Sequence, residues 1–183
     1  MLRVRTRLYP KIERGVLALG WLRAAEAKHG RGGKRLIFVC SGNICRSPYA
    51  EAIARMRGLN AISCGTHTRT GLPADGLAVT EAARRAVDLT SHTTTRWEDI
   101  ELEEGDLIIA MQLRHAWAVL PRARAHHNPV VMLSSLLAEF APVWDPYGKP
   151  GDAYERAFDL IDAGVQRMTQ WHDLAARELN GCA

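Results

Sequence analysis

Metal-ligand motifs and disulfide-forming cysteines are scarce in this sequence. Its 183 residues include four cysteines, at positions 40, 45, 64 and 182, and their number and irregular spacing are not typical of a secreted disulfide framework. No Cys-x-x-Cys pair or His-Glu-x-x-His motif argues for zinc. The adjacent His126 and His127 favour a polar loop, because chain neighbours rarely converge on one ion. We therefore expect reduced thiols, a cytoplasmic location and no metal or other cofactor.

Long apolar runs are also lacking. The longest one in the N-terminal region, residues 15–22, is far shorter than a membrane span and ends at Arg23. A secretory signal has a basic start and a short apolar run as well, but no clean cleavage motif follows here.

Net positive charge is confined to the N-terminal end of the chain. Residues 1–35 contain ten Lys or Arg against two Glu, a net of +8, whereas the remainder contains 14 against 18, a net of −4. A uniformly basic nucleic-acid-binding surface is therefore not expected. We interpret residues 1–33 as a basic, partly helical extension with a Gly-rich linker and residues 34–183 as one domain. The extension can dock on anionic lipid or an acidic kinase, be a mobile tail, or reflect an overlong start assignment.

Apolar strand-length segments alternate with helix-compatible ones. Strands are expected at residues 35–40, 60–64, 106–111 and 129–133, and helices at about 47–57, 75–87, 112–120 and 152–179, with Ser47 as a possible cap before Pro48. This order predicts a single α/β domain with a four-stranded parallel sheet and helices on both faces. Ligands bind such sheets where a strand's carboxyl end leads into a helix, which is where residues 40–47 lie.

The sequence Cys-Ser-Gly-Asn-Ile-Cys-Arg-Ser-Pro occupies residues 40–48, and we call residues 40–46 the phosphate loop. Gly42 and Asn43 tolerate the backbone curl that turns N–H groups inward as an anion site. The expected phosphate ligands are the backbone of Ser41, Gly42, Asn43, Ile44 and Cys45, and the fork of Arg46. The same N–H groups and the helix dipole favour the thiolate of Cys40, which can attack phosphorus in line.

Two neighbouring side chains allow more than one interpretation. Ser47 can donate a hydrogen bond to the Cys40 thiolate, cap the helix, or do both. Cys45 can form a reversible disulfide with Cys40 that protects the nucleophile from over-oxidation, or it can simply pack in the core.

With Ala50 and Glu51, these residues resemble the signature of the low-molecular-weight protein tyrosine phosphatases. The resemblance extends over residues 35 to about 178, because Asp145 and Pro146 stand near the last helix, where that family has an Asp-Pro pair. It implies a phosphatase I-like fold and hydrolysis of phosphotyrosine through a phosphocysteine intermediate.

The resemblance also implies an acid. A departing tyrosine oxygen needs a proton and the later water needs a base, so one carboxyl can serve both steps. Asp145 is the candidate, although Asp-Pro is also a common turn dipeptide. By the same resemblance His92 supports Asn43, with an ordinary surface-loop histidine as the alternative.

Substrate recognition is expected from Arg69 and Tyr147. Tyr147 matches an aromatic residue at the pocket mouth of relatives, and a deep aromatic slot would leave phosphoserine out of reach. Arg69 stands near a position where familiar members often have Trp, so their substrate preference cannot be copied. Together with residues 111–115, this loop is similar to bacterial members that dephosphorylate tyrosine kinases of polysaccharide export. The implied partner is such a phosphotyrosine protein, and Arg69 can favour acidic flanking residues.

Two competing functions have less support in the sequence. Arsenate reduction on this fold uses two further cysteines, and here none lies between Cys64 and Cys182. Cys182 would have to reach back to the site from the tail. The presence of Cys40, Arg46 and Asp145 together argues against a non-catalytic phosphotyrosine-binding module.

Overall fold

Four parallel strands form the centre of the computed structural model, which describes residues 35–137 and 141–180. The strands are β1 (Arg35–Cys40), β2 (Ala61–Gly65), β3 (Asp106–Ala110) and β4 (Val130–Met132). They lie in the order β2-β1-β3-β4, and all neighbours are parallel. The predicted sheet is confirmed, and every strand lies close to its expected range. The predicted extension at residues 1–33 and Cys182 lie outside the described residues.

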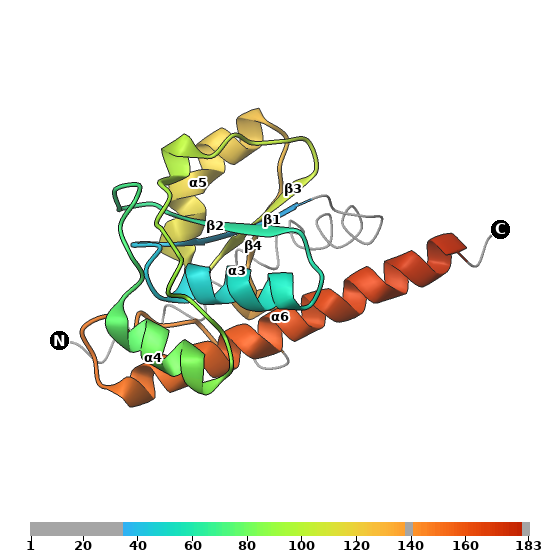
Figure 1. Cartoon of the computed structure of the whole chain (residues 1–183). Helices are drawn as coiled ribbons and strands as arrows, with labels where there is room; N and C mark the ends of the chain where they lie inside the picture. The colour runs from blue at the N-terminus through green and yellow to red at the C-terminus, as the bar shows by residue number, and fades with distance from the viewer. Residues whose placement is uncertain (1–34, 138–140, 181–183) are drawn as a thin grey trace.

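Helices cover both faces of this sheet, as predicted. They are α3 (Arg46–Met56), α4 (Gly76–Arg84), α5 (Leu113–Ala125) and α6 (Gly151–Asn180), with short 3-10 turns at Trp97–Asp99 and Leu133–Leu136. Figure 1 shows α5 on one side of the sheet and α3, α4 and α6 on the other. Within the described ranges, we found no helix with the length and apolar character that a bilayer crossing requires.

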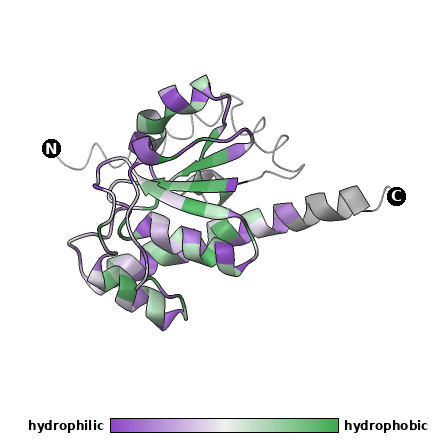
Figure 2. Cartoon of the chain, turned by 45° about the horizontal axis from the view of Figure 1, so that its top comes forward, coloured by the Kyte–Doolittle hydropathy of each residue, from purple (hydrophilic) through white to green (hydrophobic). Residues whose placement is uncertain are grey.

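The alternation of side chains along β1 explains why both faces are covered. Phe38 and Cys40 belong to a core cluster with residues of α3, α4 and α6, whereas Ile37 and Val39 belong to a second cluster with residues of α5. Since successive strand residues point to opposite faces, a strand that is apolar throughout needs cover on both. Figure 2 accordingly shows predominantly hydrophobic strands at the centre of the molecule.

Two predicted helix ends were wrong. The helix expected to reach about Val87 ends at Arg84. The helix after the third strand was expected to end at Leu120, just before Pro121, a residue that removes a backbone donor and disfavours helical geometry in the preceding residue. Instead α5 continues to Ala125, with Pro121 inside it. Ala123 beyond the proline is fully buried, and the Arg122 guanidinium donates to the carbonyl oxygens of Trp97 and Ile100. Tertiary packing therefore holds the last turn despite the proline.

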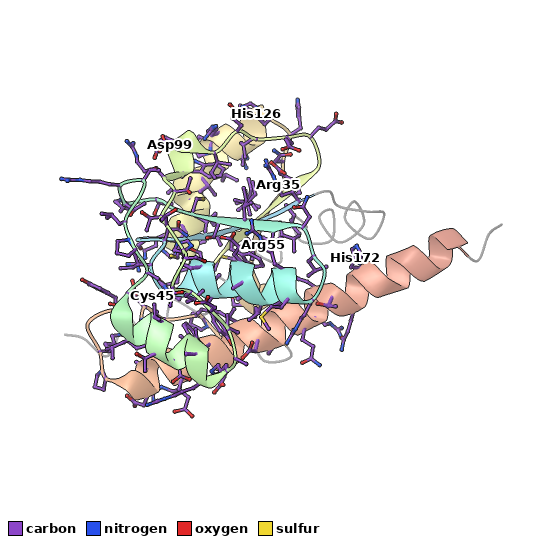
Figure 3. The ribbon with its side chains drawn as sticks, viewed as in Figure 1. Arg35, Cys45, Arg55, Asp99, His126 and His172 are labelled. Atoms are coloured by element: carbon purple, nitrogen blue, oxygen red, sulfur yellow. The ribbon has the colours of Figure 1, made fainter. Side chains whose placement is uncertain are left out.

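The sheet order brings two loops to one edge. Because β1 and β3 are parallel neighbours, the segments that follow their carboxyl ends lie side by side. At the opposite end Arg35 makes two hydrogen bonds to the Asp106 carboxylate, of 2.9 and 2.8 Å, which ties the first residues of both strands together. Figure 3 shows Arg35 and Cys45 toward opposite ends of the sheet.

Candidate active site

The phosphate loop curls around the sulfur of Cys40. Cys40 is buried at the end of β1, and the backbone N–H of Asn43 donates to its Sγ over 3.2 Å. Asn43 has a positive φ of 53°, which an Asn tolerates better than most residues. The expectation that Gly42 shares this curl was wrong, since it is not among the described glycines with positive φ. A Cβ on Gly42 would lie 3.2 Å from Ile44 Cγ1, so the glycine keeps the loop free of a crowding side chain.

Ser47 contacts the sulfur of Cys40 rather than the helix end. The helix α3 begins at Arg46, and Cys45 precedes it without any side-chain capping bond, so the predicted N-cap role of Ser47 was wrong. Its Oγ lies 3.0 Å from Cys40 Sγ and accepts a bond of 2.9 Å from Asn43 Nδ2. Ser47 is fully buried. Its hydroxyl is therefore available to donate to a thiolate at position 40.

Asn43 is held from three directions. Its Nδ2 also donates to Ser63 Oγ over 2.8 Å, and its Oδ1 accepts from the backbone N–H of Thr95 over 2.8 Å. His92 Nε2 lies 2.8 Å from the Asn43 carbonyl oxygen, and since a carbonyl only accepts, this nitrogen carries the proton. The contact is the one expected for His92. These bonds stabilise the left-handed backbone at Asn43.

Arg46 is a fully buried cation with an unused donor. Its Nη1 donates to Gln112 Oε1 over 3.0 Å and to the Val143 carbonyl over 3.2 Å, and its Nη2 lies 2.7 Å from Asp145 Oδ2. Its Nε is buried and has no hydrogen-bond partner among the described residues. A buried guanidinium N–H without an acceptor is costly. A phosphate oxygen bound in the loop would supply that acceptor and make the guanidinium a two-pronged ligand.

Asp145 reaches the site from the loop before α6. Besides Arg46, the half-exposed Arg114 side chain contacts the same oxygen, Asp145 Oδ2, at 3.2 Å. Asp145 Oδ1 faces the backbone N–H of Tyr147 at 3.4 Å, a long contact typical of an Asx turn. The carboxyl is 35% exposed, so it can exchange protons with water and with a leaving group.

A cavity of about 610 Å³ opens above the phosphate loop. Its lining brings together Asp145, Arg69, Tyr147 and the predicted loop residues other than the buried Asn43, and adds His67, Thr68 and Leu72. Tyr147 is 60% exposed. The Arg69 guanidinium makes no hydrogen bond or ion pair with any residue that the structure describes. The mouth therefore combines an aromatic wall with an exposed cation.

Gln112 and His115 are site residues that the sequence did not reveal. Both are buried beside the phosphate loop, and His115 Nε2 lies 2.9 Å from Ser41 Oγ. Burial lowers the pKa of His115 to about 2, with further lowering by the charges of Arg46 and Arg114. The sequence signals available were their place just after a strand that borders β1 and the resemblance of residues 111–115 to bacterial members, which gave neither residue a role.

Cys45 and Cys64 differ in their relation to the nucleophile. Burial is the main cause that raises the pKa of both thiols, so both are protonated at neutral pH. Cys45 shares the core cluster of Cys40, whereas Cys64 belongs to the cluster on the other sheet face. Figure 3 shows Cys45 at the start of α3. Cys45 is thus the described cysteine that shares both the loop and the sheet face of Cys40.

Comparisons with known proteins agree with this geometry. The model of a family described as "Low molecular weight phosphotyrosine protein phosphatase" matches residues 35–179. The probable low molecular weight protein-tyrosine-phosphatase EpsP of Ralstonia nicotianae is 34% identical over 134 residues, which are 72% of this chain and 91% of that protein. The protein-arginine-phosphatase of Bacillus subtilis is 28% identical over 142 residues, 74% and 94% of the two chains.

A solved structure extends the similarity to three dimensions. Wzb of Vibrio vulnificus, in complex with benzylphosphonate, superposes with a TM-score of 0.67 at 26% sequence identity. The match covers 76% of this chain and 99% of that one.

Proposed function

Because the chain belongs to the low molecular weight phosphotyrosine protein phosphatase family, whose members are phosphoric monoester hydrolases, we propose that it hydrolyses protein phosphotyrosine through a phosphocysteine on Cys40. The observation that carries the proposal is the common cavity lined by Cys40, Arg46 and Asp145. A thiol, an anion-binding fork and a carboxyl on one cavity wall are the groups that such a reaction needs.

In the first step the phosphoryl group leaves tyrosine for sulfur. The phosphate dianion is bound by the loop N–H groups and by Arg46, which exchanges its ion pair with Asp145 for phosphate oxygens. The Cys40 thiolate attacks phosphorus as the bond to the phenolic oxygen breaks. Asp145, as a carboxylic acid, gives its proton to that oxygen, so tyrosine departs neutral.

In the second step water removes the phosphoryl group from the enzyme. The Asp145 carboxylate takes a proton from the attacking water, a new P–O bond forms and the S–P bond breaks. The sulfur leaves as a thiolate. The Ser47 hydroxyl, 3.0 Å away, stabilises that anion by donating a hydrogen bond.

Protein phosphotyrosine is favoured over other phosphate esters by the cavity walls. Leu72 and Tyr147 present apolar surface at the mouth, with exposed fractions of 44% and 60%, and an aromatic ring packs well against such walls. The free cation of Arg69 favours acidic residues beside the phosphotyrosine. We propose that the physiological substrate is a bacterial tyrosine kinase of polysaccharide export, and that the reaction takes place in the reducing cytoplasm, where Cys40 stays a free thiol.

A relay of thiols for arsenate reduction has less support. Cys64 is fully buried and packs on the sheet face opposite to Cys40. A Cys40–Cys64 disulfide would need the strand to reorient.

Turnover of p-nitrophenyl phosphate in EDTA tests the proposal. We expect full activity in the chelator, loss of at least about a thousandfold in Cys40→Ser because the hydroxyl is a far weaker nucleophile, and a loss of about a hundredfold in Asp145→Asn. A phosphotyrosine peptide should be hydrolysed in preference to phosphoserine and phosphoarginine peptides of equal sequence. An active Cys40→Ser variant, or a preference for phosphoarginine, would contradict the proposal.

A further inference from the structure

One short segment contacts both the phosphate loop and Asp145. Residues 112–115, which we call the positioning segment, contact Arg46 through Gln112, the phosphate loop through His115, and Asp145 through Arg114. We propose that this segment holds the phosphate loop and the acid in register, with His115 as the hydrogen-bond acceptor for the loop. The inference rests on the proposed function, because it assigns positioning roles around the same site.

The sheet dictates where the segment lies. The N–H of Met111, just after β3, donates to the carbonyl oxygen of Val39 over 3.0 Å, so the chain leaves β3 directly beside the loop that leaves β1. Gln112 keeps an extended backbone, with φ −150° and ψ 158°, before α5 begins. The first turn of the helix then stands against the phosphate loop.

Gln112 binds Arg46 without neutralising it. Its amide oxygen accepts from Nη1 at 3.0 Å, and both side chains are at most 3% exposed. A carboxylate at this place would compete with phosphate for the guanidinium charge, whereas an amide fixes the geometry and leaves the charge available.

The tautomer of His115 follows from its neighbours. Arg114 Nε, which can only donate, lies 3.2 Å from His115 Nε2, so this nitrogen is an acceptor and the Ser41 hydroxyl at 2.9 Å donates to it. A second ring proton is opposed first by burial and then by the charges of Arg46 and Arg114. His115 therefore remains neutral at every pH at which the enzyme works.

The other ring nitrogen indicates why a histidine is present. His115 Nδ1 is buried and has no hydrogen-bond partner in the part of the chain that the structure describes. An unpaired buried donor costs stability, and an apolar side chain of the same size would avoid that cost. Such violations of packing rules concentrate at functional sites. The contact from Nε2 to the phosphate loop is therefore the reason for the residue.

Arg114 extends the connection to the acid. Its guanidinium spans from His115 Nε2 to Asp145 Oδ2. When phosphate draws Arg46 away from Asp145, Arg114 still contacts the carboxyl and keeps it at the mouth of the cavity.

Substitution of His115 and Arg114 separates these roles. In His115→Phe, which keeps a ring but removes the acceptor, we expect the inhibition constant of inorganic phosphate to rise about tenfold and kcat to fall about tenfold for good and poor leaving groups alike. In Arg114→Leu, kcat should fall more for phenyl phosphate, whose leaving group has a pKa of about 10, than for p-nitrophenyl phosphate. His115→Gln, which offers an amide acceptor, should recover most of the lost activity.

His126→Phe is the matched control, since His126 lies exposed at the far end of the same helix (Figure 3); it should behave as wild type. The pH profile of kcat should be the same for wild type and His115→Gln, because neither side chain titrates. A folded His115→Phe with wild-type constants, no rescue by glutamine, or a pH limb that disappears in His115→Gln would overturn the proposal. In each of these cases, the proposed function would still stand if wild type turned over substrate and Cys40→Ser did not. Should His115→Phe not fold, the glutamine and Arg114 variants carry the same test.

Discussion

At the scale of single residues, the chemistry depends on how one hydroxyl shares its proton. Ser47 Oγ receives a hydrogen bond from Asn43 and has two possible acceptors, Cys40 Sγ at 3.0 Å and the Cys64 carbonyl at 3.3 Å. The thiolate is charged and nearer, so it takes the proton when Cys40 is ionised. Once the sulfur carries a phosphoryl group, the Cys64 carbonyl is the better acceptor. Ser47 can therefore change its hydrogen-bond acceptor as the charge on sulfur changes during the cycle, while its oxygen stays in place.

The Cys40 thiolate is susceptible to oxidation, and we expect Cys45 to protect it from over-oxidation. Peroxide converts the Cys40 thiolate to a sulfenic acid; the Cys45 sulfur then attacks the Cys40 sulfur, and water leaves as a disulfide forms. Because burial raises the pKa of Cys45, this attack is slow at neutral pH and faster in mild alkali. We expect dithiothreitol to restore most activity to peroxide-treated wild type and only a small part to Cys45→Ala.

Cys64→Ala is the control for this prediction. Its thiol is also buried and its pKa is also raised, but it lies on the other sheet face, so its removal should leave the recovery unchanged. Equal recovery in all three proteins would show that no Cys40–Cys45 disulfide protects the site. Detection of the disulfide by mass spectrometry provides the direct measurement.

Residue by residue, the sequence alone predicted what is contiguous; the distant Asp145 and His92 were predicted only through the family resemblance, and Gln112 and His115 were missed. Cys40, Arg46 and their loop are neighbours in the chain, so their spacing between a strand and a helix was informative. Gln112 and His115 are 66 and 74 positions away from the residues that they bind. A glutamine and a histidine at a helix start have many possible roles, and only the pairing of β1 with β3 selects this one.

At the scale of elements, the phosphate loop depends on close contact with the end of β2. A Cβ on Gly65 would lie 2.7 Å from the Ser41 carbonyl oxygen and 3.1 Å from Asn43 Cβ. Since the first of these is backbone, the loop itself must shift in Gly65→Ala. A displacement of this size at a catalytic loop costs up to about a hundredfold in rate. We expect kcat/KM for p-nitrophenyl phosphate to fall at least about tenfold.

Gly76→Ala is the matched substitution. A Cβ there meets nothing within 4 Å, and the residue begins α4, so alanine should leave activity unchanged and stabilise the protein slightly. Wild-type kcat/KM in Gly65→Ala would mean that the loop tolerates the shift and that its close packing is not needed for catalysis.

The existence and order of the elements were predictable, whereas some of their ends were not. Continuous apolar runs fixed the four strands, and Gly58, with φ 79°, ends α3 as expected. The rules for proline failed at α5, because the bonds of Arg122 to a distant turn outweigh the bond lost at Pro121. Such compensation comes from residues far away in sequence, which local patterns do not contain.

At the scale of the whole molecule, burial keeps several thiols, a phenol and an imidazole uncharged. Burial raises the pKa of Cys64 and Tyr154 and lowers that of His115. Above the ordinary pKa values of thiols and phenols, at about pH 8.5 and 10, the unfolded chain releases protons that the folded chain retains. Stability is therefore lost as pH rises through that range, and a corresponding loss is expected on the acid side.

The acid limb of this stability profile should belong in large part to His115. Its pKa is 6.5 in an ordinary environment and about 2 in the fold. Below pH 6.5 the unfolded chain therefore binds a proton at this histidine that the folded chain does not bind. The contribution is zero above pH 6.5 and grows unfavourable as pH falls, by up to about 1.4 kcal/mol per pH unit. Urea unfolding at pH 7 and pH 5 should therefore show a smaller loss of unfolding free energy in His115→Gln than in wild type, by about 2 kcal/mol. His126→Phe, which changes an exposed residue at the far end of the same helix, is the control and should follow wild type. Parallel losses in wild type and His115→Gln would mean that the imidazole accepts its proton in the folded state, and the neutral acceptor at the phosphate loop would then have to be abandoned.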